Sequence, residues 1–271
     1  TPHMGWSAIE ENGAGTWTIS QANTHTGATT INNGGLVGVT GGSCTNSAVS
    51  LLSSPGNAAA LGISITNNAT RWPCASLTVN NAGTSCTLDF NFGNVVPSET
   101  IAPMTVIGAA AFTTTPLVTV EVGNDVGPAG SQYPLITWAS TSGTAPAAVT
   151  VTSPRNITAH LSVIGNTLYL VIDTNREPLT WKTSPAGVWD VDTTVNWKDS
   201  TGADTTYKET ILPGDQVMFD DTYISADTVV TLNTVVTPSS MHSSNTLYNY
   251  TIAGTGALMA TNVGGVYQLL F

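Results

Sequence analysis

Hydrophobic and polar positions alternate along short segments of the chain, and turn-forming residues separate these segments. Residues 16–19 alternate, residues 23–27 are polar and turn-forming, and alternation resumes at residues 28–31. A period of two indicates a half-buried β-strand, whereas Asn and Gly favour turns. The strands recur about every 10–12 residues, a spacing typical of either a β-sandwich or a β-solenoid.

The same pattern continues through most of the sequence. Further strands are predicted at residues 36–39, 77–79, 86–92, 104–107, 117–122, 161–163 and 168–172. Thr, Val, Asn and Gly are poor helix formers and are abundant throughout, so the sequence predicts an all-β fold. One short helix is predicted within residues 51–61, around Ala58-Ala59-Ala60, and residues 45–75 fit the strand pattern least well.

Composition changes near residue 176, which predicts a domain boundary there. Beyond it Trp181, Trp189 and Trp197 follow one another at intervals of eight residues, and acidic residues become concentrated. We therefore divide the chain into residues 1–175 and a Trp-rich β module of residues 176–271. The second module either continues the architecture of the first or folds as a separate sandwich.

Charge and hydropathy exclude several classes of protein. Six Lys and Arg stand against 17 Asp and Glu, for a net charge of −11, so a nucleic-acid partner is not expected. Hydrophobic residues make up 41% of the chain, which argues against disorder. The longest nearly apolar run, residues 108–112, is far too short for a membrane span.

The three cysteines cannot all pair within one chain. Cys86 alternates with Leu88 and Phe90 on an apolar face, which predicts a buried, unreactive thiol. Cys44 and Cys74 both lie in loop-like sequence, and we predict a Cys44–Cys74 disulfide in an extracellular setting. Three free thiols are the alternative.

A repeat motif occupies residues 13–34. Residues 13–20 run Gly-Ala-Gly-Thr-Trp-Thr-Ile-Ser, and residues 22–34 run Ala-Asn-Thr-His-Thr-Gly-Ala-Thr-Thr-Ile-Asn-Asn-Gly. This segment resembles the autotransporter-associated β-strand repeat, whose motif is roughly Gly-x-Gly-Thr-Trp-Thr-Leu-Ser followed by Ala-Asn-Thr-Tyr-Thr-Gly-x-Thr-Thr-Ile-Asn-x-Gly. His25 stands where that repeat usually has tyrosine.

The downstream region is similar to large bacterial surface proteins that carry such repeats, as in Verrucomicrobia and Planctomycetes. The similarity lies in residues 179–181, 187–190, 196–197, 207, 214–221, 235–239 and 250–256. Together the resemblances imply a secreted or surface-anchored right-handed parallel β-helix, a β-solenoid with residues 1–175 as its repeat region and residues 176–271 continuing it. Stacked coils of this fold share one apolar core, with Asn and Gly at the bends.

Motifs for catalysis are missing from the sequence, so we expect neither an enzyme nor a cofactor. The four histidines are scattered, and none has metal-ligand spacing from another His or Cys. Asp190, Asp192, Asp215 and the pair Asp220-Asp221 could serve a glycosidase or a calcium site, but turn and strand-end roles are favoured. Core packing is likewise favoured for the three tryptophans over a sugar-stacking platform.

Both ends of the sequence carry apolar, strand-like segments that predict self-assembly. The candidate contact residues are Trp6, Ala8 and Ile9 at one end, and Val266, Tyr267, Leu269, Leu270 and Phe271 at the other. Exposed strand edges of this kind invite further pairing. The sequence therefore favours an extracellular structural module that stacks end to end into a fibre, stalk or filament. The alternative is an adhesin-like passenger that binds surface glycans or calcium.

Overall fold

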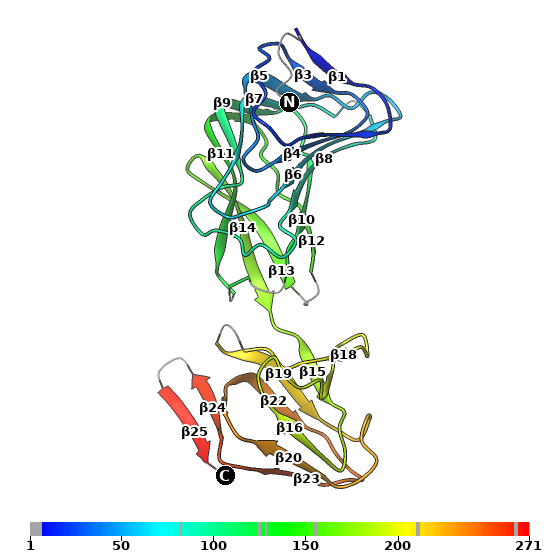
Figure 1. Cartoon of the computed structure of the whole chain (residues 1–271), viewed down its shortest axis with the longest axis vertical. Helices are drawn as coiled ribbons and strands as arrows, with labels where there is room; N and C mark the ends of the chain where they lie inside the picture. Colours follow the sequence, from blue (N-terminus) through cyan, green and yellow to red (C-terminus); the bar gives the residue numbers. More distant parts are fainter. Residues whose placement is uncertain are drawn as a thin grey trace. The chain divides into compact units, whose positions relative to one another are not determined.

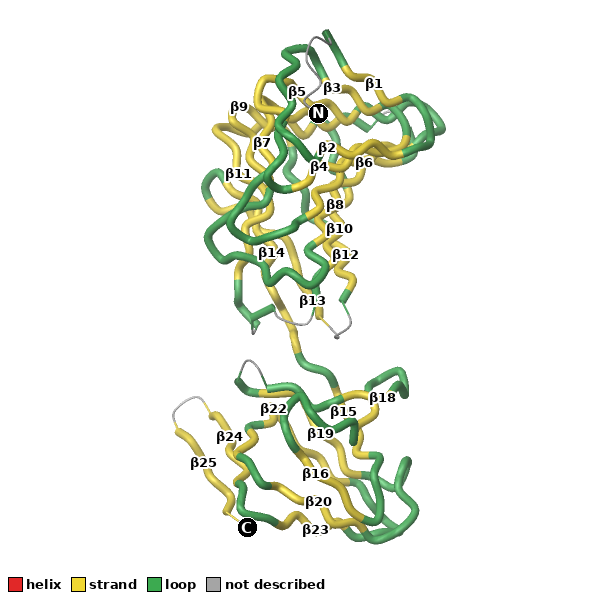
Figure 2. Tube along the Cα trace, viewed as in Figure 1, coloured by secondary structure: helices red, strands yellow, loops and turns green. Residues whose placement is uncertain are grey.

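The computed structural model describes residues 7–81, 83–123, 126–127, 129–153, 157–209, 212–262 and 265–270 (Figure 1). Within these ranges the secondary structure consists of strands and loops without a helix, as Figure 2 shows, which confirms the all-β prediction. The chain divides into two compact units, unit 1 (Thr1–Asn175) and unit 2 (Arg176–Phe271).

Unit 1 contains fourteen named strands in two sheets. The strands are β1 (Ile9–Glu11), β2 (Thr16–Ile19), β3 (Thr29–Ile31), β4 (Gly34–Val39), β5 (Cys44–Leu51), β6 (Ala58–Ser64), β7 (Trp72–Val79), β8 (Ser85–Asn91), β9 (Met104–Phe112), β10 (Leu117–Glu121), β11 (Gln132–Gly143), β12 (Val149–Thr152), β13 (Ile157–Ile164) and β14 (Thr167–Asn175). One sheet has the order β1-β3-β5-β7-β9-β11-β14-β13, and the other has the order β12-β10-β8-β6-β4-β2.

From β1 to β12 the chain alternates between these two sheets with every strand. Each strand therefore pairs in parallel with the strand two places before it, for example β3 with β1 and β4 with β2. Figure 1 shows β4, β6, β8, β10 and β12 following one another along one side of the unit. The last two strands of the first sheet, β13 and β14, form an antiparallel pair.

The parallel register stacks like residues in columns, and these columns form the core of unit 1. Leu36, Leu61, Leu88 and Val118 lie directly beside one another on β4, β6, β8 and β10, and each is at most 1% exposed. We use the word coil for a set of successive strands with one strand from each sheet of a unit. Because a strand alternates its side chains between two faces, the in-register apolar positions of every coil reach the same interior.

Asn residues occupy bends between strands, as the sequence predicts, and Ser residues occur there as well. The Asn32 side-chain amide donates a hydrogen bond of 2.8 Å to the Asn12 side chain, which lies in the preceding coil. The Ser54 hydroxyl donates one of 3.1 Å to the Asn32 carbonyl. These bonds satisfy polar groups at the corners, where the strands' own pairing ends.

The helix predicted around Ala58-Ala59-Ala60 is wrong, because these residues begin β6. Strand β6 pairs in parallel with β4 on one side and with β8 on the other. Its buried positions include Ala59, Leu61 and Ile63, which are each 1% exposed and alternate as a strand requires. Pairing on both sides and burial therefore override the helix preference of three alanines.

Unit 2 contains eleven named strands in three sheets. The strands are β15 (Pro178–Trp181), β16 (Ala186–Trp189), β17 (Trp197–Lys198), β18 (Asp204–Thr205), β19 (Gly214–Phe219), β20 (Thr228–Leu232), β21 (Val235–Val236), β22 (Pro238–Ser243), β23 (Tyr250–Ala253), β24 (Ala257–Asn262) and β25 (Gly265–Leu270). The sheet orders are β18-β17-β15-β19-β22, β16-β20-β23 and β21-β24-β25. The pairs of β19 with β15 and β22, of β20 with β16 and β23, and of β21 with β24 are parallel.

A cluster of aromatic side chains forms the core of unit 2. Trp181, Trp189 and Trp197 are each at most 1% exposed. The Trp197 ring packs edge-on against Trp181 at 5.0 Å and against Trp189 at 5.2 Å between centroids. This confirms the core-packing interpretation, since side chains buried in this way cannot form a platform for a sugar.

Candidate functional site

The first coil of unit 1 has strands with only one partner each. Among the described strands, β1 pairs with β3 alone and β2 pairs with β4 alone, so each lies at the edge of its sheet. An edge strand presents unpaired backbone N–H and C=O groups that can pair with another chain. The edge formed by β1 and β2, termed the leading edge below, is therefore a candidate interaction surface.

Trp17 marks the leading edge as apolar. It lies in register with Leu36, at the end of the buried column that continues through Leu61 and Leu88. Its side chain is nevertheless 50% exposed, because no described strand lies beyond β2 to cover it. The core column of unit 1 thus ends on a half-exposed tryptophan.

Of the N-terminal assembly candidates Trp6, Ala8 and Ile9, the structure describes Ala8 and Ile9. Ile9 belongs to β1 and is 9% exposed, whereas Ala8 precedes the strand and is exposed. Trp6 lies outside the described residues. Sequence reasoning did not select Trp17, although its alternation with Thr16 and Thr18 already places it on the same face as the later core positions.

The last coil of unit 2 also has edge strands. Strands β22 and β23 each pair on one side only, whereas β24 lies between β21 and β25. Val266, Tyr267, Leu269 and Leu270 lie in β25, which pairs antiparallel with β24. Phe271 lies outside the described residues.

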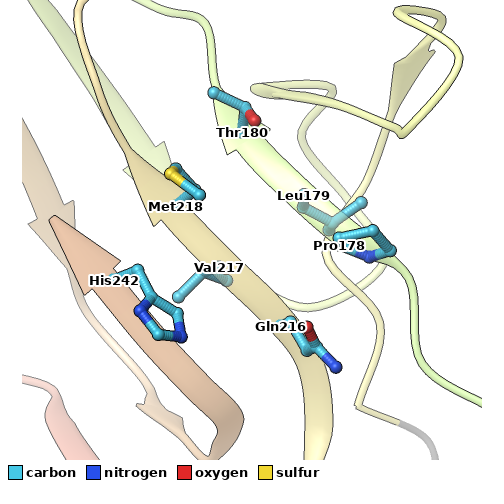
Figure 3. Close-up of a pocket in the computed structure, with 7 residues that line it drawn as sticks. All are labelled: Pro178, Leu179, Thr180, Gln216, Val217, Met218 and His242. Atoms are coloured by element: carbon cyan, nitrogen blue, oxygen red, sulfur yellow. The ribbon is translucent and has the colours of Figure 1, made fainter. Parts of the chain in front are cut away.

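An open pocket with a volume of about 70 Å³ lies on unit 2 (Figure 3). Pro178, Leu179 and Thr180 of β15 line one side of it, residues 216–218 of β19 lie along its middle, and His242 of β22 stands opposite. Ligand pockets are usually about 300–1,000 Å³ and carry several converging polar groups. This pocket is smaller and contains no carboxylate beside its one imidazole, so its lining lacks a general acid and base pair.

Of the acidic residues considered for a catalytic or calcium site, Asp190, Asp215, Asp220 and Asp221 accept hydrogen bonds from backbone amides. Asp221 accepts hydrogen bonds from the N–H groups of Thr246, Leu247 and Tyr248, and the bond from Thr246 is the largest cause that lowers the pKa of its carboxyl group. Asp215 is 1% exposed and accepts the N–H groups of Glu177 and Lys208. These contacts agree with the turn and strand-end roles that the sequence favours.

No group of three or more His, Cys, Asp or Glu side chains placed to hold a metal ion occurs among the described residues. The described residues also contain no helix that is long and apolar enough to cross a membrane.

Cys44 and Cys74 lie directly opposite each other on the adjacent parallel strands β5 and β7. In the structure both are free thiols, so the predicted disulfide is not formed there. Both are fully buried, and burial raises the pKa of each thiol to about 12. Neighbouring strands are about 4.7–4.9 Å apart, which falls within the Cα separation that a disulfide spans. The third thiol, Cys86, is 2% exposed beside buried Leu88 and Phe90, as the sequence predicts.

We expect that protein folded in an oxidising compartment will contain the Cys44–Cys74 disulfide. A thiol with a pKa near 12 is almost entirely protonated at neutral pH, so the bond should form during folding, while the thiols are accessible. Alkylation of the unfolded protein followed by mass measurement should label Cys86 alone before reduction and all three cysteines after it. Three labelled thiols before reduction would contradict the pairing.

Comparison with known protein families places the leading edge within a recognised repeat. Residues 10–37 match the family described as passenger-associated-transport-repeat. The match runs from β1 through β2 and β3 into β4, and it confirms the resemblance to the autotransporter-associated repeat. Searches of curated proteins and of solved structures find no match. The first two coils of the chain are thus a repeat of the class associated with autotransporter passengers.

Proposed function

We propose that this chain is a secreted or surface-exposed passenger module that stacks end to end with further copies into a fibre, stalk or filament. The leading edge, with its unpaired strands and half-exposed Trp17, is the observation that carries this proposal. The passenger-associated repeat in residues 10–37 supports the extracellular location. The proposed role is structural and includes no catalysis, no cofactor and no nucleic-acid partner.

The proposed architecture is a right-handed parallel β-helix. Two features of unit 1 support a helix of coils: the strict alternation of β1 to β12 between two sheets, and the parallel pairing of each strand with the one two places earlier. In unit 2 the three parallel sets β15–β19–β22, β16–β20–β23 and β21–β24 support the same arrangement. Stacked coils propagate their core in one direction, so their ends are the natural surfaces for growth.

Assembly of this kind is head to tail, because the first coil of one copy meets the last coil of another. A head-to-tail contact between different surfaces does not close on itself unless the rotation allows a ring, so it yields filaments. The net charge of −11 makes copies repel at low ionic strength. Screening shortens this repulsion to about 8 Å at physiological salt, so assembly should strengthen as salt is raised.

Sedimentation velocity and negative-stain electron microscopy across a concentration series test the proposal. We expect filaments that lengthen with concentration, and we expect Trp17→Ala to shorten them or abolish them. Leu247→Ala is the matched control, since Leu247 is 75% exposed on unit 2 and lies outside the leading edge. A protein that stays monomeric at every concentration and salt would overturn end-to-end assembly.

A further inference from the structure

Six glycines, most of them at corners between strands, share one geometry. Where a Cβ atom would stand, the carbonyl oxygen of the preceding coil lies between 1.9 and 2.9 Å away, too close for any side chain. The glycines and the carbonyls that they face are Gly34 with Gly15, Gly83 with Ser54, Gly108 with Ala75, Gly143 with Phe112, Gly254 with Leu232 and Gly256 with Thr234. Glycine is thus required at these positions because the coil before them packs backbone against backbone.

Gly15 departs from this geometry. No atom of the described residues lies within 4 Å of the position that its Cβ would take, and its φ is outside the left-handed range that favours glycine. Each of the other glycines from Gly13 to Gly256 has a positive φ or an atom within 4 Å, although for Gly13 the nearest atom is the Glu11 carboxylate oxygen at 3.2 Å. Gly15 belongs to the corner between β1 and β2, and no described strand precedes that corner in the stack. A coil packed onto the leading edge would fill the open space beside Gly15.

We infer that the last coil of a second copy of this chain, β23 with the corner Gly254-Thr255-Gly256 and β24, packs onto the leading edge with its corner against Gly15. The inference rests on the proposed function and specifies the two surfaces that meet. The corner Gly13-Ala14-Gly15 has the same Gly-x-Gly pattern as residues 254–256, so the backbones of both corners can approach closely.

When the two corners are aligned, residues that face the core in one coil lie beside residues that face the core in the other. Trp17 then lies on Leu258, which is 5% exposed and part of the unit 2 core. Ile9 lies on Tyr250, whose side chain packs against that same core. A register shifted by one residue towards the N-terminus would place Ile9 and Glu11 opposite Asn249 and Thr251, which are exposed, so the burial of the β23 positions supports this alignment.

One position in this register is unfavourable. Glu11 is 7% exposed and lies on Ile252, which also packs against the unit 2 core. Its carboxylate accepts the Gly13 N–H at 2.8 Å, and a coil packed over it would remove its remaining water. Inward-pointing charges of this kind restrain strand edges from pairing. We therefore expect Glu11→Gln to lower the concentration at which the chain assembles.

Strand β25 has to leave β24 for this junction to form. It pairs antiparallel with β24 on the side away from β21, which is the edge that β2 of the next copy would occupy. The junction is therefore a strand exchange, in which parallel β2 replaces antiparallel β25. This differs from the hypothesis drawn from the sequence, in which residues 266–271 make the contact themselves.

A tandem fusion of two copies tests the packing at Gly15 with an internal control. Gly15→Val is placed either in the first copy, whose leading edge is free, or in the second, whose leading edge can meet the corner at residues 254–256. We expect the melting temperature to fall by several degrees only when the substitution is in the second copy. An equal effect in both copies, or none in either, would overturn the inference.

Deletion of residues 265–271 tests the strand exchange in the single chain. Sedimentation velocity should show assembly at lower concentration than for the full chain, because the edge of β24 is then free. Loss of assembly would overturn the exchange and favour residues 266–271 as the contact. If single chains never form filaments while the tandem fusion shows the second-copy effect, the junction stands and the proposed function fails.

Discussion

Replacing Trp197 by alanine will unfold unit 2 and leave unit 1 folded. The Trp197 side chain is 1% exposed and touches the rings of Trp181, Trp189 and Phe219 at centroid distances of 5.0, 5.2 and 5.6 Å. Removing a buried tryptophan costs about 3–5 kcal/mol, which is comparable with the whole stability of a small domain. Unit 2 has its own core cluster, so its loss should not spread to unit 1.

Differential scanning calorimetry and circular dichroism check this expectation. The calorimetric trace of the wild-type protein should contain the unfolding transitions of both units. Trp197→Ala should abolish the unfolding transition of unit 2. Leu247→Ala is the control, because Leu247 is 75% exposed on unit 2 and its loss should barely move the melting temperature. Complete unfolding of Trp197→Ala would instead mean that the two units fold only together.

Replacing Gly83 by alanine will destabilise unit 1 strongly. The new methyl group would lie 2.1 Å from the Ser54 carbonyl oxygen and 2.5 Å from that of Asn57, so the preceding coil must move. Overpacking of this kind costs about 3 kcal/mol when the obstacle is backbone. The backbone of the preceding coil is held by its own parallel pairs, which limits its movement.

Gly15→Ala is the matched control for Gly83→Ala in the same unit. Neither glycine has a φ in the left-handed range, and only the space around the two positions differs. Urea unfolding followed by circular dichroism should give a much lower midpoint for Gly83→Ala and an unchanged midpoint for Gly15→Ala. Equal midpoints for the two variants would show that backbone entropy, rather than contact with the preceding coil, governs these positions.

The sequence pattern predicted strands correctly where local secondary-structure propensity and long-range strand pairing favour the same structure. Alternation in residues 86–92 predicted β8 with Cys86, Leu88 and Phe90 on one buried face, and all three are at most 2% exposed. The prediction failed at residues 58–60, where three alanines favour a helix but lie between β4 and β8. Propensity is local, whereas the pairing that overrides it comes from residues about 25 positions away in the sequence.

The candidate site was predicted only in part for a similar reason. Apolar composition at the two ends of the sequence pointed to Ile9 and to residues 266–271, but composition cannot show which strand edges remain unpaired. The structure shows that β25 turns back onto β24, and that β22 and β23 are edges. It also shows that Trp17 ends a buried column while half of its own surface is exposed.

By itself the sequence determined the all-β class and the passenger-associated repeat, because both depend on residue types at short, regular spacings. Only the tertiary structure decided which strands are neighbours, since each parallel pair joins segments separated by a whole coil. The role of each corner glycine depends on the same long-range register. Gly15 and Gly34 belong to the same repeat, yet only Gly34 packs against a preceding coil within this chain.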